Sequence, residues 1–220
     1  MSILLNIILP IFAIIAAGYL CGRKGLLGEG STDGLNKFVY WIALPALLFR
    51  AMANVDLNEL FNWDFIGAYV GGQAITMVIG ILIGCVIFKN SIAQGGMNGM
   101  NVVYGNVGFL GVPLAFAAFG DSASVPTIIT VVVNSAVVVG VATIIIELAQ
   151  KRSASVASIL YDVLIALVKN PMLVAPVLGM LWATLDYPLP LPVDKFCQLL
   201  GAAAGPCALF AIGLFLVGKP

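Results

Sequence analysis

The amino-acid sequence predicts an all-α polytopic membrane protein with seven transmembrane helices. The chain is 61% hydrophobic and only 9% charged, and its mean hydropathy is +1.10. Soluble domains usually carry about 25% charged residues. Seven apolar runs approach the roughly 20 residues that a membrane span requires, and they cover residues 3–20, 35–53, 65–88, 99–119, 125–148, 170–185 and 196–217.

The first three runs are predicted to be ordinary spans. Run 3–20 has no basic region before it and is long enough to span, so we expect a retained helix rather than a cleaved signal. Run 35–53 ends near Arg50, whose long side chain reaches the membrane interface. Run 65–88 contains Gly-Gly-Gln-Ala at 71–74, whose small residues favour close helix packing. We expect Gln73 to form a hydrogen bond with a neighbouring residue.

The fourth run, 99–119, contains Tyr-Gly-Asn-Val-Gly-Phe-Leu-Gly-Val-Pro at residues 104–113. Its three glycines weaken a helix, and Pro113 breaks one because it lacks an N–H and clashes with the preceding turn. Freed backbone groups at membrane depth are tolerated only inside protein or beside a wet cavity. We therefore predict a break between Gly105 and Pro113, with Pro113 opening a second half-helix.

This break is the predicted solute site. The N–H groups around 111–114 and the amide of Asn106 are donors, and a helix N-terminus favours an anion. The fifth run, 125–148, adds a polar pair midway along. The candidate substrate-binding residues are Asn106, Gly108, Gly111, Val112, Pro113, Asn134 and Ser135. The alternatives are glycines used only for packing and an Asn134 that only bonds a neighbouring helix.

The last two runs resemble the first two. Pro10, Gly18, Pro45 and the pair Leu48-Phe49 recur 161 residues later, as Pro171, Gly179, Pro206 and Leu209-Phe210. Coincidence in a low-diversity composition is the alternative. Five spans separate the copies, and an odd number inverts the second copy, as in many secondary transporters. We expect a first five-helix repeat at 1–148, a cytoplasmic linker at 149–169, and an incomplete inverted repeat at 170–220. Residues 159–169 form either an interfacial helix or the first turns of the sixth span.

The charges predict an orientation. Cations gather in the odd-numbered loops and after the last span, at Arg23, Lys24, Lys37, Lys89, Lys151, Arg152 and Lys219. The other side carries mostly acids, at Asp56, Glu59, Asp64, Asp121, Asp186 and Asp194. The positive-inside rule places the N-terminus outside and residue 220 inside.

The chain resembles the auxin efflux carrier family, which includes plant PIN-type carriers and bacterial permeases for malonate and similar acids. The motif Asn-x-Gly-Phe-x-Gly-x-Pro at 106–113 is the most specific part of this resemblance, which also rests on residues 9–19, 43–49, 169–171 and 206–213. The resemblance implies ten spans in two inverted repeats, with crossing broken helices in spans four and nine. We therefore expect this chain to belong to a longer transporter and to be inactive in transport alone.

The predicted function is secondary transport of a small organic anion, such as a mono- or dicarboxylate, by alternating access. A sensor or partner subunit on the same fold is the alternative, and an enzyme is disfavoured because the chain has no histidine, HExxH or GxSxG. Proton coupling, sodium coupling and uniport stay open. We expect lipid as a partner and a bacterial inner membrane as the location, leave a homodimer open, and expect neither nucleic acid, cofactor nor metal site.

Overall fold

The computed structural model describes residues 2–28, 30–55, 62–149, 161, 164–165 and 167–218, and every regular element among them is helical. Three stretches are long and apolar enough to cross a membrane, namely Trp63–Ile87, Leu191–Leu216 and Ile92–Ile146, the last of which includes the non-helical residues 104–106. Shorter apolar helices cover Ile8–Arg23 and Pro171–Ala183. The all-α membrane class is thereby confirmed, and the count of seven spans stays a prediction.

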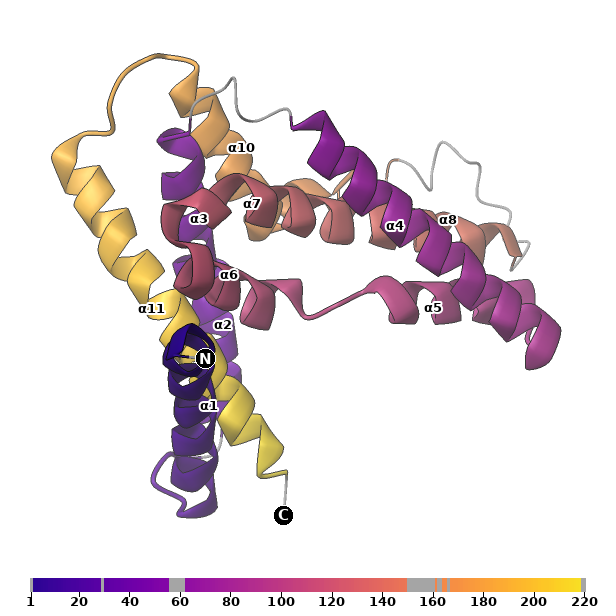
Figure 1. Ribbon diagram of the computed structural model, residues 1–220, viewed down its shortest axis with the longest axis horizontal. Helices are drawn as coiled ribbons and strands as arrows, with labels where there is room; N and C mark the ends of the chain where they lie inside the picture. Colours follow the sequence, from indigo (N-terminus) through magenta and orange to yellow (C-terminus); the bar gives the residue numbers. More distant parts are fainter. Residues whose placement is uncertain are drawn as a thin grey trace.

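One group of helices contains the two ends of the chain (Figure 1). Here α1 (Ser2–Arg23) packs against α11 (Leu191–Leu216), and α3 (Leu44–Ala53) packs against α10 (Pro171–Ala183). The short helix α2 (Ser31–Phe38) precedes α3 on the same span. These contacts bring residues from the first and last quarters of the sequence side by side.

Glycines permit both of these close crossings. A methyl group on Gly18 of α1 would collide with the carbonyl oxygen of Phe210 in α11. A methyl group on Gly179 of α10 would collide with the carbonyl oxygen of Phe49 in α3. Gly18 and Gly179 are 161 residues apart, and so are Phe49 and Phe210. Both crossings therefore involve residues that the 161-residue offset within the chain pairs with one another.

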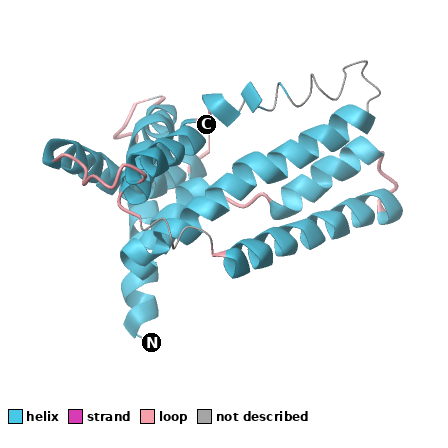
Figure 2. Cartoon of the chain, turned by 90° about the horizontal axis from the view of Figure 1, so that it is seen from above, coloured by secondary structure: helices cyan, strands magenta, loops and turns pink. Residues whose placement is uncertain are grey.

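A second group of helices extends to one side of the first (Figures 1 and 2). Its first helix begins at Trp63, and Asn62 caps it by accepting the N–H of Phe65 at 3.0 Å. Its second helix begins at Ile92, and Ser91 and Gln94 cap it with a reciprocal capping box, which satisfies two backbone donors. The group consists of α4 (Trp63–Leu82), α5 (Ile92–Val103) and α8 (Val139–Ala149), with α5 in contact with both others.

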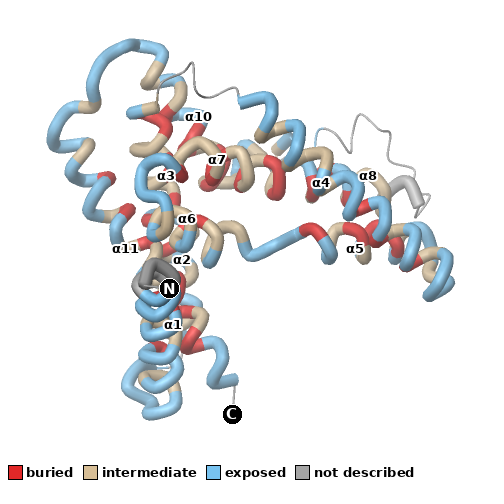
Figure 3. Tube along the Cα trace, viewed as in Figure 1, coloured by how far each residue is buried: buried red, intermediate tan, exposed pale blue. Residues whose placement is uncertain are grey.

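Two further helices pack against the first group, and one of them also contacts the second. The short helix α6 (Val112–Phe119) contacts α11, whereas α7 (Ser124–Val132) contacts α3 and α10 of the first group and α4 of the second. The main core gathers where these elements meet (Figure 3), and its buried residues are Val39, Ala43, Leu44, Leu48, Met52, Val112, Ile128, Val131, Met172, Ala204 and Ala208. In lipid such a core holds helices together mainly by close packing.

Four segments within these helices are π-helical, with hydrogen bonds spaced five residues apart rather than four. They are η1 (Val39–Ala43), η2 (Ile83–Ile87), η3 (Val107–Gly111) and η5 (Val133–Val138). A π-helical turn often marks a functional site, so their positions guide the search for one.

Part of the predicted organisation lies outside the described residues. This applies to most of the linker at 149–169, including Asp162. It also applies to several residues of the charge pattern, namely Asp56, Glu59, Lys151, Arg152 and Lys219. The division into repeats and the orientation therefore stay predictions.

Candidate functional site

The fourth predicted span is interrupted, as expected. The non-helical residues are 104–106, at the start of the predicted break rather than beside Pro113. Helix α5 ends at Val103, residues 104–106 are not helical, and the chain resumes with η3, which continues into α6. Asn106 caps the resumed helix, because its Oδ1 accepts the N–H of Phe109 at 3.2 Å. Asparagine is among the preferred residues at this position.

The prediction that Pro113 opens the second half-helix is therefore wrong. Pro113 lies inside the resumed helical run, after the π-helical turn of η3. The N–H of Gly111 donates to the carbonyl of Asn106 at 3.0 Å, five residues back, and Val112 also donates within η3. This wider turn precedes a proline that has no N–H to contribute. The N–H groups of Gly111 and Val112, two of the donors predicted at 111–114, are thus engaged within the helix.

The free donor of the resumed helix is the N–H of Gly108. Val107, Phe109 and Leu110 all donate to acceptors in the preceding loop. Gly108 has no acceptor among the described residues, as expected for the first turn of a helix. The backbone donor of this motif therefore lies three residues earlier than the sequence suggested.

A cavity of about 360 Å³ lies beside the break. Among the described residues that line it, none carries a charge, and several carry hydrogen-bonding groups. The lining residues are Tyr40, Tyr104, Gly105, Asn106, Val107, Gly108, Phe109, Val131, Asn134, Ser135 and Met172. The cavity thus unites four of the seven predicted site residues, namely Asn106, Gly108, Asn134 and Ser135.

Three of the four π-helical segments meet at this cavity. Tyr40 comes from η1, Gly108 from η3, and the pair Asn134 and Ser135 from η5. These segments belong to three different predicted spans. Their convergence distinguishes this cavity from the two others described below.

Asn134 is the most buried polar residue of the cavity wall, with 3% of its surface exposed. Its Nδ2 donates to the hydroxyl of Tyr69 at 2.6 Å and to the carbonyl of Thr130 at 3.1 Å. The same hydroxyl accepts from Gln73 at 2.8 Å, as the sequence predicted for a neighbour of Gln73. Asn134 Oδ1 has no partner among the described residues, which is rare for a buried polar atom.

Tyr40 connects the cavity to the start of α10. Its hydroxyl donates to Oδ1 of Asn170 at 3.1 Å. The same oxygen caps α10 by accepting the N–H of Met172 at 3.0 Å. Sequence reasoning missed Tyr40, Tyr104 and Met172 as lining residues. The Asn-Pro pair at 170–171 is a helix-start signal that could have been used.

The other predicted site residues lie elsewhere. Gly111 lines a second, mostly apolar cavity of about 620 Å³ between α6 and α7. Val112 is fully buried in the main core, and Pro113 lies against Gly205 of α11. A third cavity of about 590 Å³ lies between α4 and α5 and is lined in part by Asn98. A binding role for Gly111, Val112 and Pro113 stays a prediction.

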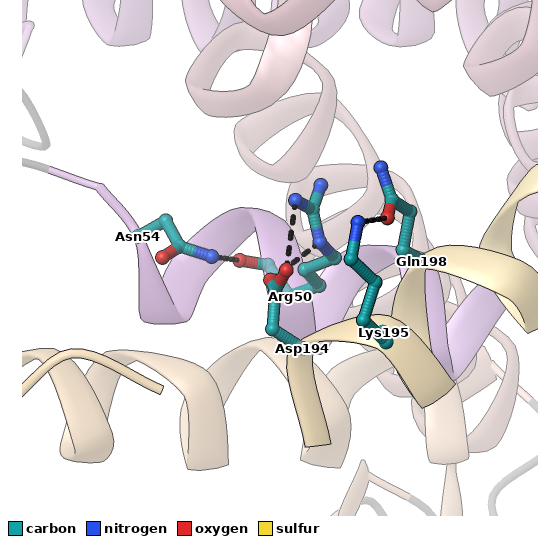
Figure 4. A network of polar contacts seen from close by, with 5 residues as sticks. All are labelled: Arg50, Asn54, Asp194, Lys195 and Gln198. Atoms are coloured by element: carbon teal, nitrogen blue, oxygen red, sulfur yellow. Dashed lines mark hydrogen bonds and ion pairs between the residues drawn. The ribbon is translucent and has the colours of Figure 1, made fainter. Parts of the chain in front are cut away.

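An ion pair lies away from these cavities, at the end of α3 (Figure 4). Arg50 Nε lies 2.7 Å from Asp194 Oδ1 in the first turn of α11. Asn54 donates to the Arg50 carbonyl at 2.8 Å, and Lys195 donates to Gln198 at 2.9 Å. The pair ties α3 to α11 beside the main core. Within the described part of the chain, no group of three His, Cys, Asp or Glu residues could hold a metal ion.

Comparison with known proteins identifies related sequences. A family profile described as "Membrane transport protein" matches residues 3–220. A Rhizobium meliloti protein named "Putative malonate transporter" is 30% identical over the whole chain and 69% of its own length. "Uncharacterized transporter YfdV" of Escherichia coli is 27% identical over 95% of this chain and 67% of its own length.

A third relative has a different kind of name. The "Lysosomal cholesterol signaling protein" of Mus musculus is 24% identical over 96% of this chain, which covers 26% of that protein. The same sequence pattern therefore occurs inside a much longer animal protein. These matches agree with the resemblance that the motif at 106–113 indicated.

Proposed function

Because the chain belongs to the membrane transport protein family, which is the auxin efflux carrier family, we propose that it forms the solute-binding part of a secondary transporter. The proposed solute is a small organic anion, such as a mono- or dicarboxylate. The observation that carries this proposal is the cavity beside the break at 104–106, where three π-helical segments from three predicted spans meet.

The chemistry of the cavity supports an anion. The N–H of Gly108 and the Nδ2 of Asn106 are donors without partners among the described residues. Both stand at the start of a helical run, where the helix dipole favours negative charge. No described lining residue carries an acidic side chain that would repel a carboxylate. Fixed donors in a helix break are a common way for transporters to hold an anionic group.

The paired helix crossings support an inverted repeat. A rotation that exchanged α1 with α10 and α3 with α11 would convert the α1–α11 contact into the α10–α3 contact, and both contacts are present. The glycine contacts at Gly18 and Gly179 obey this exchange. We propose that the two copies are inverted and that alternating access occurs around the cavity. Proton coupling, sodium coupling, uniport and a homodimer all remain open.

We propose an inner-membrane protein with its N-terminus outside. The support is the excess of cations in the odd-numbered loops. Single cysteines introduced beside Lys24 and Asp121, in a variant that lacks the native cysteines, report the orientation. A membrane-impermeant maleimide should label the position near Asp121 in intact cells and the position near Lys24 only after permeabilisation. The opposite labelling would overturn the orientation.

A panel of radiolabelled carboxylates tests the transport proposal. The full-length protein is reconstituted in proteoliposomes, and uptake is compared with that of liposomes without protein. Saturable uptake of one or more carboxylates is expected. Binding of the same solutes without flux would instead favour a sensor or partner subunit, which the match to a protein named for signalling supports as a second candidate.

A further inference from the structure

The third cavity, of about 590 Å³, follows one face of α4 and one face of α5. On α4 its lining residues recur every three or four positions from Thr76 to Phe88. On α5 they include Asn98 and Asn101, whose spacing of three residues puts them on the same face of the helix. Asn90, in the loop between the two helices, also lies in the wall. The wall of this cavity therefore holds three asparagines and a threonine.

The polar side chains of this wall lack partners. Thr76, Asn98 and Asn101 make no side-chain hydrogen bond within the part of the chain that the structure describes. In contrast, Gln73, one turn before Thr76 on α4, donates to the hydroxyl of Tyr69 at 2.8 Å. Unpaired hydroxyls and amides are strongly disfavoured in hydrocarbon, and polar groups at membrane depth are tolerated where they line a wet cavity. This wall is therefore suited to water rather than to lipid.

Glycines of α4 form the floor of the cavity. A methyl group on Gly84 would lie 2.7 Å from Nδ2 of Asn98, so a larger residue would displace the asparagine. A methyl group on Gly80 would lie 3.3 Å from Cγ2 of Val102. A water molecule takes about 30 Å³ of liquid volume. The cavity, at about 590 Å³, therefore has room for a continuous column of water.

The cavity extends from the loop at 88–90 to the neighbourhood of the break. Residues 76 and 88 are about 18 Å apart along the helix axis, at 1.5 Å per residue, and the hydrocarbon core is roughly 30 Å thick. At the deep end, Asn101 lies in the wall just before the non-helical residues 104–106. At the mouth, Lys89 is exposed between two lining residues. The cavity therefore reaches from a membrane surface to about the depth of the break.

We propose that this cavity is a water-filled access path for anions, which opens at the loop 88–90 and leads to the break at 104–106. Lys89 makes the mouth electropositive and raises the local concentration of anions. The neutral amides of the wall hydrate an anion without holding it tightly, as passage requires. That the anion is the transported solute rests on the proposed function, whereas the water and the sign of the potential do not.

Cysteine accessibility tests the presence of water. Single cysteines are placed at Thr76 and Asn98, in the full-length protein without its native cysteines. Ile75 and Met97 are the matched controls, because each adjoins a test position, is exposed, and is absent from the cavity wall. Methanethiosulfonates react with the thiolate, which forms in water and not in hydrocarbon. A reagent of fixed charge therefore labels only cysteines that water reaches.

The fixed-charge reagent should label Thr76→Cys and Asn98→Cys about tenfold or more faster than Ile75→Cys and Met97→Cys. The labelling should proceed from the side of the membrane on which Lys89→Cys is labelled, so the test does not depend on the predicted orientation. Labelling after unfolding confirms that every cysteine is present. Because the two test positions lie on different helices, one of them decides the matter if the other variant does not fold.

The charge of the reagent tests the sign of the potential. A sulfonate and a trimethylammonium methanethiosulfonate of similar size are compared on Asn98→Cys at low ionic strength, where screening is weak. Lys89→Glu should lower the ratio of the anionic to the cationic labelling rate by about threefold or more, because it reverses the charge at the mouth. Lys24→Glu makes the same change in the first loop, on the same predicted side, and should leave the ratio unchanged.

Three results would overturn the inference. Labelling of Thr76→Cys and Asn98→Cys that is no faster than labelling of the controls would show that lipid or protein covers the cavity. Labelling only from the side opposite Lys89→Cys would place the mouth elsewhere. An unchanged ratio in Lys89→Glu would remove the selection of anions. Failure of every carboxylate to enter proteoliposomes would instead refute the proposed function, and it would leave rapid labelling of the path unaffected.

Discussion

Replacing Asn106 with alanine should remove a helix cap and a solute contact at once. Asn106 Oδ1 accepts the N–H of Phe109 at 3.2 Å, and the residue also lines the cavity. Loss of an N-cap costs about 0.5–2 kcal/mol of folding stability. Loss of a hydrogen bond to a charged ligand costs about 1–3 kcal/mol of binding free energy. The dissociation constant of a carboxylate should then rise roughly 5- to 150-fold, because about 1.4 kcal/mol corresponds to tenfold.

Asn106→Asp separates these two losses. Aspartate keeps an oxygen that can cap Phe109, so the unfolding temperature should stay near that of the unaltered protein, whereas alanine should lower it. Aspartate also removes the donor and places a negative charge beside the solute. We therefore expect Asn106→Asp to bind a carboxylate more weakly than Asn106→Ala does, although it is the more stable variant.

Two measurements test this opposition of stability and binding. Thermal unfolding in detergent gives the stability of each variant, and isothermal titration calorimetry with a carboxylate gives the dissociation constant. Binding by Asn106→Asp that equals or exceeds binding by Asn106→Ala would refute the argument for an anionic solute. Unchanged binding in both variants would assign Asn106 to helix capping alone.

Three further predictions follow from the contacts of the helices. Gly179→Ala places a methyl group against the carbonyl of Phe49; we expect a loss of about 1–3 kcal/mol of stability, and an unchanged unfolding temperature would contradict it. Tyr69→Phe removes the acceptor of Asn134 Nδ2 and should cost about 1–3 kcal/mol, measured by thermal unfolding against the Phe65→Leu control. In the full-length protein, Pro113→Ala should slow uptake more than it lowers the unfolding temperature, because alanine lets ordinary helix continue through η3; a mainly structural loss would argue against this.

The sequence predicted the interruption of the fourth span better than its position. Three glycines and Pro113 indicate a weak helix, yet they do not say which residue restarts it. The decisive signal was Asn106, because asparagine favours an N-cap, and its Oδ1 fills that role. Proline is tolerated in the first turn of a helix, so the sequence predicts that Pro113 opens one. In the structure the preceding π-helical turn accommodates it instead.

The cavity was predicted in part for similar reasons. Asn106, Gly108, Asn134 and Ser135 were found because polar residues and glycines stand out in apolar spans. Tyr40 was missed because a tyrosine near a span end is usual at membrane interfaces, and nothing local indicates the π-helical turn that contains it. Which acceptor lacks a partner depends on Tyr69 and Thr130, which lie on other turns or helices and cannot be paired from sequence alone.

The π-helical turn at η1 distinguishes the second predicted span from the seventh, which the 161-residue offset predicts to be its copy. A π-turn holds an extra residue within the helix, so residues before it are rotated by about 100° relative to an uninterrupted α-helix. The corresponding stretch of α11, 161 residues later, is continuous α-helix. Tyr40 therefore lines the cavity, whereas its counterpart Gly201 lies against Leu47. Deleting one residue from η1 should turn it into ordinary α-helix, as in α11, and rotate Tyr40 out of the cavity wall.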